Sequence, residues 1–201
     1  MSDSIGVGLI GFGTVGSGVV ELLQDAPSSM RRRKHIDFSL QRIAVRDLKK
    51  TRRTSIDPAL LTANAEEVVA DPAVQLVVEL TGAAGAFDWV SEALRQGKDV
   101  VTANKAMLAE RGEELFELAL ANGADLMFEA SVAGGIPIIK ALREGLSGNS
   151  FSGVYGILNG TCNYILTEMR DGVRAGKPRN FDIVLKEAQE LGYAEADPST
   201  D

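Results

Sequence analysis

Two kinds of apolar pattern alternate along the first 128 residues. Short apolar runs without polar alternation are typical of strands buried on both faces, and they occupy residues 5–10, 39–45, 73–80, 99–102 and 124–128. Between these runs, apolar residues recur at helical spacing and predict helices over 14–24, 87–96 and 107–122. Strands that alternate with helices indicate an α/β fold, a doubly wound parallel sheet with helices on both faces.

The pattern changes after residue 136. It predicts a helix over 137–146, a strand over 151–158 that opens a new unit, and helices over 161–170 and 181–191. We therefore expect two domains, with limits 1–149 and 150–201. The second unit has one evident strand in about fifty residues, too few to hold a core alone. We expect it to be the incomplete start of an α+β domain.

A glycine-rich turn joins the first predicted strand to the first predicted helix. Gly11-Phe12-Gly13-Thr14-Val15-Gly16 is a G-x-G-x-x-G motif in the context that confirms a dinucleotide fingerprint. In that motif the first glycine permits the tight turn, the second lets a pyrophosphate approach, and the third lets the helix pack closely. N–H groups near Thr14 and Val15 at the helix start bind the diphosphate. The motif predicts a Rossmann-type domain and an NAD(P)-dependent oxidoreductase.

The end of the second predicted strand bears on the choice of cofactor. NAD-binding proteins usually carry an acid there for the ribose hydroxyls, and Asp47 is close by. Arg46 precedes it, and an arginine pairs well with the 2′-phosphate of NADP. Basic residues follow at Lys49, Lys50, Arg52 and Arg53. We expect NADP, with NAD as an alternative; in the simpler interpretation Arg46 only faces solvent.

Ligands of open α/β sheets bind beyond the carboxyl ends of the strands. Thr81 and Gly82 follow the third predicted strand and suit a position against the cofactor. Lys105 follows the fourth, where it can bind a substrate carboxylate or polarise a carbonyl; a cation at a helix start opposes the helix dipole, which favours a functional role. Glu129 follows the fifth, and needs a partner if buried. The glycine-rich loop behind it offers carbonyl oxygens that suit a hard cation such as sodium.

Two later segments carry candidate substrate contacts. Residues 159–164 lie between a predicted strand and a helix, where Thr161 either caps the helix or holds a substrate. Residues 192–198 place two acids in a turn, suited to a substrate ammonium group or simply to a solvated loop.

The amino-acid composition excludes several classes of function for this chain. Lys and Arg number 21 against 28 Asp and Glu, a net charge of −7, which disfavours nucleic acid as a partner. One cysteine, Cys162, and one histidine, His35, leave no disulfide, no His/Cys zinc site and no evident Ser-His-Asp triad. No run reaches the length of a membrane span, and the N-terminus lacks the basic region of a signal peptide. We expect a cytoplasmic protein with no membrane partner.

Taken together, the motifs resemble homoserine dehydrogenase over nearly the whole chain. The first motif is shared by many dehydrogenases, whereas the later ones, in this order, are specific. The segments that carry the resemblance are 8–16, 45–48, 101–105, 128–137, 156–165 and 188–198.

The resemblance implies reversible reduction of L-aspartate 4-semialdehyde to L-homoserine with NADPH or NADH, on the route to threonine, methionine and isoleucine. It implies that Lys105 lies between cofactor and substrate. The implied substrate contacts are Gly160, Thr161, Tyr193, Glu195 and Asp201. The implied monovalent-cation site, for Na⁺, comprises Glu129 and the carbonyls of Val132, Gly134 and Ile136.

The resemblance also implies a homodimer or larger assembly of the full-length protein. The family's proton-donating lysine is expected beyond Asp201, so residues 1–201 are expected to bind cofactor but turn over poorly. Two alternatives remain at this point: another Rossmann amino-acid or aldehyde oxidoreductase, and a nucleotide-binding module without catalysis.

Overall fold

The computed structural model describes residues 4–24, 37–83, 85–156, 160–191 and 193–194. The chain divides into two compact units, Met1–Ser131 and Val132–Asp201. The domain limits expected from the sequence, 1–149 and 150–201, stay a prediction. In the described part of the chain, no helix is both long and apolar enough to cross a membrane.

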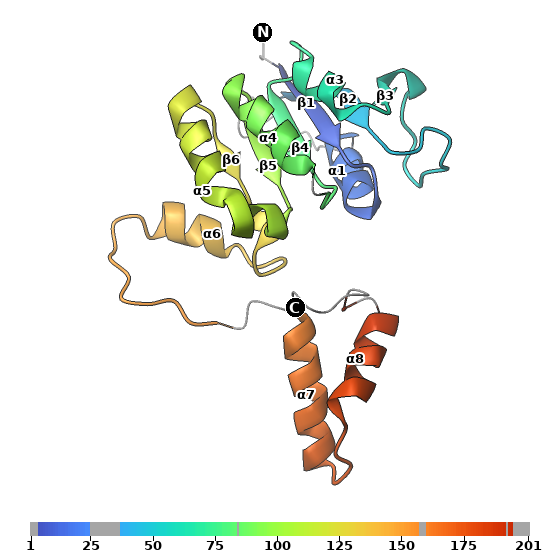
Figure 1. The fold of residues 1–201 in the computed structure, drawn as a ribbon, viewed down its shortest axis with the longest axis vertical. Coiled ribbons are helices and arrows are strands. Elements are labelled where there is room, and N and C mark those ends of the chain that lie inside the picture. The colour runs from blue at the N-terminus through green and yellow to red at the C-terminus, as the bar shows by residue number, and fades with distance from the viewer. Residues whose placement is uncertain (1–3, 25–36, 84, 157–159, 192, 195–201) are drawn as a thin grey trace. The chain divides into compact units, whose positions relative to one another are not determined.

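The first unit is built on a six-stranded parallel sheet (Figure 1). Its order is β3-β2-β1-β4-β5-β6, which confirms the predicted doubly wound fold. The strand order reverses between β1 and β4, so the crevice for a ligand lies beyond the carboxyl ends of these two strands. The strands are β1 (Ser4–Ile10), β2 (Asp37–Ala44), β3 (Leu61–Thr62), β4 (Leu76–Glu79), β5 (Asp99–Thr102) and β6 (Leu126–Met127).

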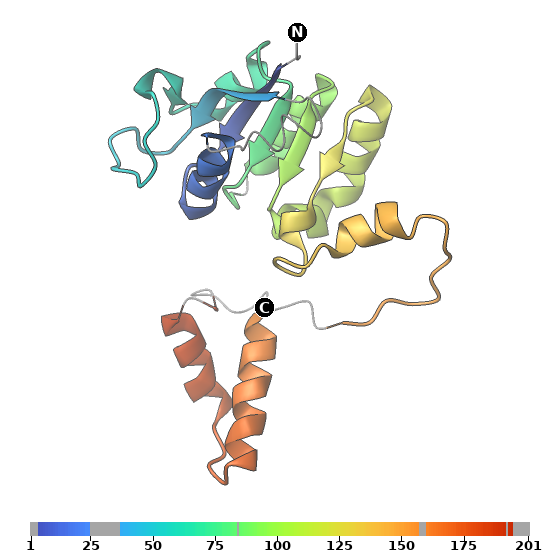
Figure 2. The ribbon, with the colours of Figure 1, turned by 180° about the vertical axis from the view of Figure 1, so that it is seen from behind.

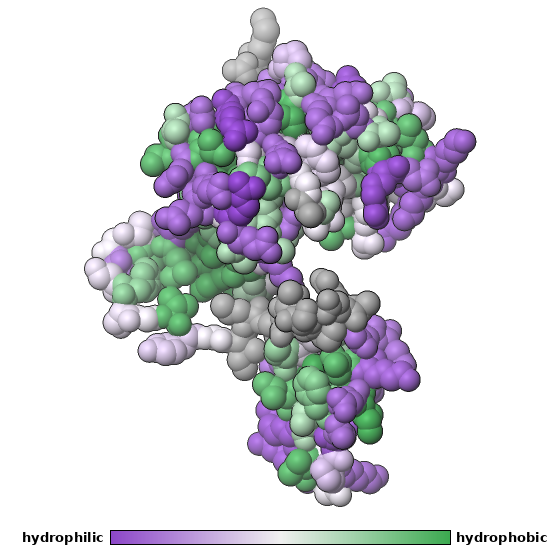
Figure 3. Space-filling view, viewed as in Figure 1, coloured by the Kyte–Doolittle hydropathy of each residue, from purple (hydrophilic) through white to green (hydrophobic). Residues whose placement is uncertain are grey.

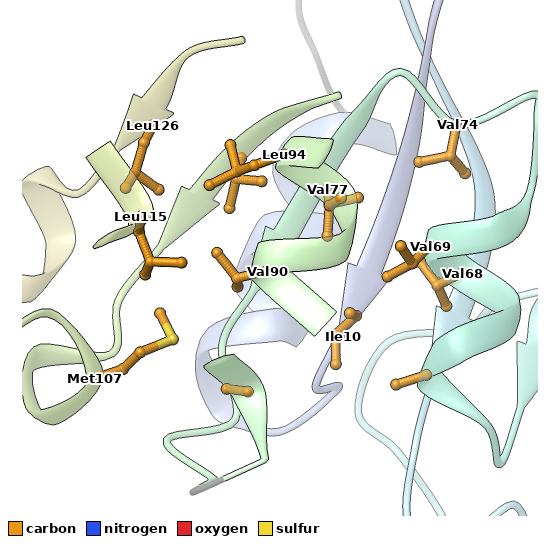
Figure 4. Packing of buried hydrophobic residues seen from close by; sticks show 14 of the residues in the cluster. Ile10, Val68, Val69, Val74, Val77, Val90, Leu94, Met107, Leu115 and Leu126 are labelled. Carbon is orange, nitrogen blue, oxygen red and sulfur yellow. The ribbon is translucent and has the colours of Figure 1, made fainter. Parts of the chain in front are cut away.

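Helices cover both faces of the sheet (Figures 1 and 2). Helix α1 (Thr14–Gln24) lies on one face; α3 (Ala65–Ala70), α4 (Ala86–Arg95) and α5 (Lys105–Asn122) lie on the other. Alternate residues of β1 serve the two faces: Leu9 packs in the cluster that contains Val20 of α1, and Ile10 in the cluster of α3 to α5 (Figure 4). The strands are therefore buried on both sides, as their continuous apolar runs predict.

Two glycines of β1 allow its close packing. A Cβ at Gly8 would lie 2.5 Å from Val68 Cγ1 of α3, and one at Gly6 would collide with the carbonyl oxygen of Ala73. Only hydrogen fits at these positions, so α3 and the chain entering β4 lie directly against the strand.

The sequence pattern predicts none of four short elements: the 3₁₀ turns η1 (Pro58–Leu60) and η2 (Glu129–Ser131), β3 and α3. The strand is only two residues long, too short for a hydrophobic period. The helix does carry a start signal, because the Asn64 side chain accepts the N–H of Glu66 and two acids occupy the first turn.

Helix α5 begins two residues before its predicted start and has a kink. Arg111 has non-helical dihedral angles, φ −137° and ψ 21°. Its guanidinium carbon lies 3.2 Å from the ring centroid of Phe87, and its Nη2 donates to Glu114 at 2.8 Å. A contact with α4 thus accompanies the kink, and helical spacing along α5 alone does not reveal it.

The second unit consists of α6 (Ile138–Lys140), the π-helical turn η3 (Ala141–Gly145), α7 (Gly160–Arg174) and α8 (Phe181–Glu190). The last two pack together around four buried residues, Ile165, Val184, Ala188 and Ala194. Arg179 donates to Glu168 at 2.7 Å and to Glu187 at 2.5 Å, which links the two helices.

The predicted strand over 151–158 is wrong over 151–156; residues 157 and 158 lie outside the described part. Residues 151–156 form neither helix nor strand. An apolar run becomes a strand only where a second strand pairs with it, and none of the described strands does. Phe151, Val154 and Tyr155 are exposed. Together with Ile136 and Leu146 they are the large apolar residues that the segment 136–155 exposes at the surface (Figure 3).

Candidate functional site

The turn between β1 and α1 has the geometry that its glycines predict. Gly11 has φ +104°, a region that favours glycine, and its N–H donates to Ala44 O at 3.0 Å. A Cβ at Gly16 would collide with the carbonyl oxygen of Gly11. The first turn of α1 therefore lies directly on the glycine turn, the close helix–strand packing expected of the third glycine.

Gly13 leaves open space over this turn. A Cβ built at Gly13 would meet no other atom within 4 Å. Thr14 and Val15 beside it are exposed, and the first N–H groups of a helix have no partner within it. Helix α1 also has no acidic residue in its first turn that would repel an anion. These features fit the diphosphate of a dinucleotide.

Arg46 and Asp47 are exposed and follow the end of β2 after one buried residue, Val45. Asp47 Oδ1 accepts the N–H of Lys49 at 2.8 Å, which turns the chain. Arg52 then folds back, donating to Asp47 O at 2.5 Å, and its guanidinium carbon lies 5.5 Å from the ring centroid of Phe12. Its Nε is buried and has no hydrogen-bond partner in the part of the chain described. A cationic loop thus lies beside the glycine turn, as the sequence indicates.

The ends of β4 and β5 bring together a second group of polar residues. Glu79, the last residue of β4, is fully buried and accepts hydrogen bonds from Thr81 and Thr102. Asn104 Oδ1 accepts the N–H of Met107 at 3.1 Å and so caps α5. Lys105 follows as the first, exposed residue of that helix.

Helix α5 therefore begins with a cation. It carries no acidic residue in its first turn, against the preference set by the helix dipole. A residue that opposes the local electrostatic preference is a candidate for a functional role.

In the second unit, three predicted substrate residues lie at neighbouring positions. Gly160 opens α7, and the buried Thr161 donates its hydroxyl to Tyr193 O at 2.5 Å. The Tyr193 ring lies 5.1 Å from that of Tyr164. Thr161 thus joins the start of α7 to the chain after α8. Glu195 and Asp201 lie outside the described residues.

The residues of the predicted cation site fall in both units. Glu129 opens the 3₁₀ turn η2 (Glu129–Ser131) and is half-buried. Val132, Gly134 and Ile136 belong to the second unit, where Gly134 has φ +61°. Within the described ranges, no three His, Cys, Asp or Glu residues cluster as metal ligands. A site made of one carboxylate and main-chain oxygens is a different kind of site, and it stays a prediction.

Comparison with known families agrees with this geometry. The family model "Homoserine dehydrogenase, NAD binding domain" matches residues 11–129, and the family model "Homoserine dehydrogenase" matches residues 137–201. The chain belongs to the homoserine dehydrogenase family. The first unit is thus matched by the family's nicotinamide-dinucleotide domain, and the alternative of a different Rossmann oxidoreductase family is set aside.

Homoserine dehydrogenases of other organisms align with this chain over almost its entire length. It is 44% identical to the Bacillus subtilis homoserine dehydrogenase over 98% of its own length, and 47% identical to that of Neisseria gonorrhoeae. It spans 45% and 44% of the lengths of these two proteins.

Solved structures of the family share its fold. The Thiobacillus denitrificans homoserine dehydrogenase superposes with a TM-score of 0.85 at 48% identity, over 99% of this chain and 45% of that one. A hyperthermophilic archaeal homoserine dehydrogenase mutant, solved in complex with NADPH, gives a TM-score of 0.77 at 26% identity, over 99% of this chain and 65% of that one.

Two residues of this region were not among the predicted site residues. Asn104 had a readable signal, because Thr-Ala-Asn occurs twice, at 62–64 and 102–104, each time directly before a helix. Glu79 had no such signal in the sequence beyond its position at the end of a strand, because its hydrogen bond is to Thr102 on the neighbouring strand.

Proposed function

We propose that this chain contributes the dinucleotide-binding domain, and part of the substrate domain, of a homoserine dehydrogenase that interconverts L-aspartate 4-semialdehyde and L-homoserine. The open Gly13 turn against the first turn of α1 carries the proposal, in a chain matched along both units by that family. The bound nicotinamide supplies the hydride donor or acceptor. The whole enzyme is expected to work in the cytoplasm, as a homodimer or larger oligomer.

Cofactor binding falls to the first unit. The N–H groups of Thr14 and Val15 face the diphosphate, with Gly11, Phe12, Gly13 and Gly16 shaping the turn. Thr81 and Gly82 lie against the cofactor. Arg46 pairs with a 2′-phosphate, which favours NADP over NAD, and the neighbouring Arg52 adds positive field.

Substrate binding falls to Lys105 and the second unit. The ammonium of Lys105 at the start of α5 suits a substrate carboxylate or a developing alkoxide. Gly160, Thr161 and Tyr193 surround the substrate, Glu195 holds its amino group, and Asp201 lines its pocket. The joined positions of Thr161 and Tyr193 support this assignment.

A monovalent cation, Na⁺, is proposed for Glu129 with the carbonyls of Val132, Gly134 and Ile136. The support is chemical: one carboxylate and several main-chain oxygens are hard ligands that suit such an ion. Omission of sodium, with potassium or choline in its place, is expected to lower turnover of the full-length enzyme.

A matched pair of glycine variants tests the cofactor site. In Gly16→Ala the new methyl group collides with Gly11 O, so the dissociation constant for NADP is expected to rise at least about tenfold. In Gly18→Ala the methyl group meets nothing within 4 Å, so binding is expected to stay within about twofold. Equal affinities in the two variants would contradict the proposed site.

The activity itself is tested with the full-length protein, NADP and L-homoserine, followed by absorbance of the reduced nicotinamide. Turnover with this amino alcohol is the expected result. Arg46→Ala is expected to raise the KM for NADP about tenfold and to leave that for NAD nearly unchanged. An equal effect on both cofactors would remove Arg46 from the 2′-phosphate site.

A further inference from the structure

One buried carboxylate links the ends of two neighbouring strands. Glu79 at the end of β4 is 0% exposed. Its Oε1 accepts the backbone N–H of Thr81 at 2.7 Å and the Thr81 hydroxyl at 2.6 Å, while Oε2 accepts the Thr102 hydroxyl of β5 at 2.8 Å. Burial of a carboxylate is unfavourable unless it is hydrogen-bonded, and these three donors supply the bonds.

The two hydroxyl groups each make a second hydrogen bond. Thr81 Oγ1 accepts the N–H of Ala83 at 3.1 Å, and Thr102 Oγ1 accepts the N–H of Asn104 at 3.0 Å. A hydroxyl has one proton to donate, and both protons point to Glu79. The carboxylate therefore sets the orientation of both hydroxyls, and through them it positions the N–H groups of Ala83 and Asn104, which it does not itself contact.

These two turns carry residues of the proposed active site. The first contains Thr81 and Gly82, placed against the cofactor. The second leads into Asn104, the cap of α5, and then Lys105. A further bond from Asn104 Nδ2 to Ala83 O, at 3.5 Å, joins the turns to each other.

We propose that Glu79 is a positioning residue, which holds the cofactor loop at 81–83 and the start of α5 in one fixed arrangement. The proposal rests on the proposed function for the role of Lys105. Reacting groups must be held to within a fraction of an ångström, and a buried hydrogen-bonded centre between two strand ends does this without contacting substrate.

A first experiment needs no activity. In Glu79→Gln, one donor of the amide replaces an acceptor, so one of the two hydroxyls must reorient. Amide hydrogen exchange at the N–H that this hydroxyl accepts, of Ala83 or of Asn104, is expected to become at least about fivefold faster, while that of Val77 and Val100 in the sheet stays within about twofold.

The chain offers a matched control for this experiment. Thr62 Oγ1 accepts the N–H of Asn64 at 3.1 Å and donates to Glu67 at 2.9 Å, the same local pattern beside a different helix. Glu67→Gln is expected to speed exchange at Asn64 and not at Ala83 or Asn104. Unchanged exchange at Ala83 and Asn104 in Glu79→Gln, or equal acceleration through the sheet, would overturn the proposal.

A second experiment uses turnover of the full-length enzyme. Thr102→Val keeps the shape but loses the hydroxyl, and kcat with L-homoserine is expected to fall at least about tenfold, with the KM for NADP within about threefold. Thr102→Ser restores the hydroxyl and is expected to keep at least about half of kcat. Equal activities of the valine and serine variants would overturn the proposal. An inactive wild type would refute the proposed function, and the exchange experiment would still decide the role of Glu79.

Discussion

Two turns of identical sequence start two helices of the first unit. Thr62-Ala63-Asn64 follows β3, and Thr102-Ala103-Asn104 follows β5. In each, the threonine hydroxyl accepts the asparagine N–H, and the asparagine side chain caps the helix. Local sequence alone therefore sets how both helices begin.

The surroundings of the two turns differ. The Thr62 hydroxyl donates to Glu67, an exposed residue of the helix that it precedes, whereas the Thr102 hydroxyl donates to the buried Glu79 of a neighbouring strand. Helix α3 opens with two acids in its first turn, and α5 opens with Lys105 and none. At the first place the hydroxyl bonds to an exposed side chain of its own helix, Glu67, which also pairs with Arg42 of β2 at 3.2 Å. At the second place it bonds directly to a buried side chain of the neighbouring strand.

Loss of the cap is expected to have the largest effect. Asn104 is 5% exposed and also bonds to Ala83 O, so Asn104→Ala is expected to lower the free energy of unfolding by about 2 kcal/mol. Asn64 is exposed, and Asn64→Ala is expected to cost about 1 kcal/mol. Urea unfolding of both variants measures the difference. Equal losses would show that the connection to β4 adds nothing to stability.

The charge at the start of α5 gives a smaller effect of opposite sign. Lys105→Glu places an acid where the helix dipole favours it, and is expected to raise the unfolding free energy by about 0.5 kcal/mol at low salt. Turnover of the full-length enzyme is expected to be lost. Ala106→Glu is the matched variant, since it adds an acid in the same turn and keeps Lys105; it is expected to raise stability alike. A destabilised Lys105→Glu variant would indicate that the lysine also supports the fold.

The acids of α3 give the smallest effect, and one that depends on pH. The indole N–H of Trp89 donates to Glu66 at 3.0 Å, and this bond, with the backbone N–H of Glu66, holds the pKa of that carboxyl below its ordinary 4.5. A lowered pKa means that the contribution to stability is complete above pH 4.5 and is lost as pH falls through the folded-state value.

Fluorescence measures this titration directly, because Trp89 is the one tryptophan of the chain. Its emission is expected to change in a step below pH 4.5, and Glu66→Gln is expected to abolish the step. Helix α5, with no acid in its first turn, offers no equivalent. A step that persists in Glu66→Gln would assign it to another group.

The sequence predicted the parts of the fold that rest on local pattern. Long apolar runs located β1, β2, β4 and β5, and the glycine motif located the turn before α1. The family relationship was also confirmed. Strand β3 could not be predicted, because two residues are too few to show a periodic apolar pattern. The strand expected over 151–158 was wrong over its described residues, because an apolar run forms a strand only if another strand pairs with it.

The site residues also divide into those that local sequence can predict and those that it cannot. Lys105 stood out because it opposes the preference of its own helix start, which is visible in the sequence. The bond from Glu79 to Thr102 joins residues of different strands, and the contact of Arg52 with Phe12 joins a loop to the glycine turn. Such pairings arise only when the sheet assembles, so no local pattern reports them.

The opening strand of the sheet has a lasting consequence for how this sequence can diverge. At Gly6 and Gly8 the backbone of Ala73 and the side chain of Val68 occupy the volume that any larger residue would need. A lineage that keeps this packing must keep both glycines, so drift in the strand is confined to its other residues, such as Val7, Leu9 and Ile10, where aliphatic side chains can exchange with one another.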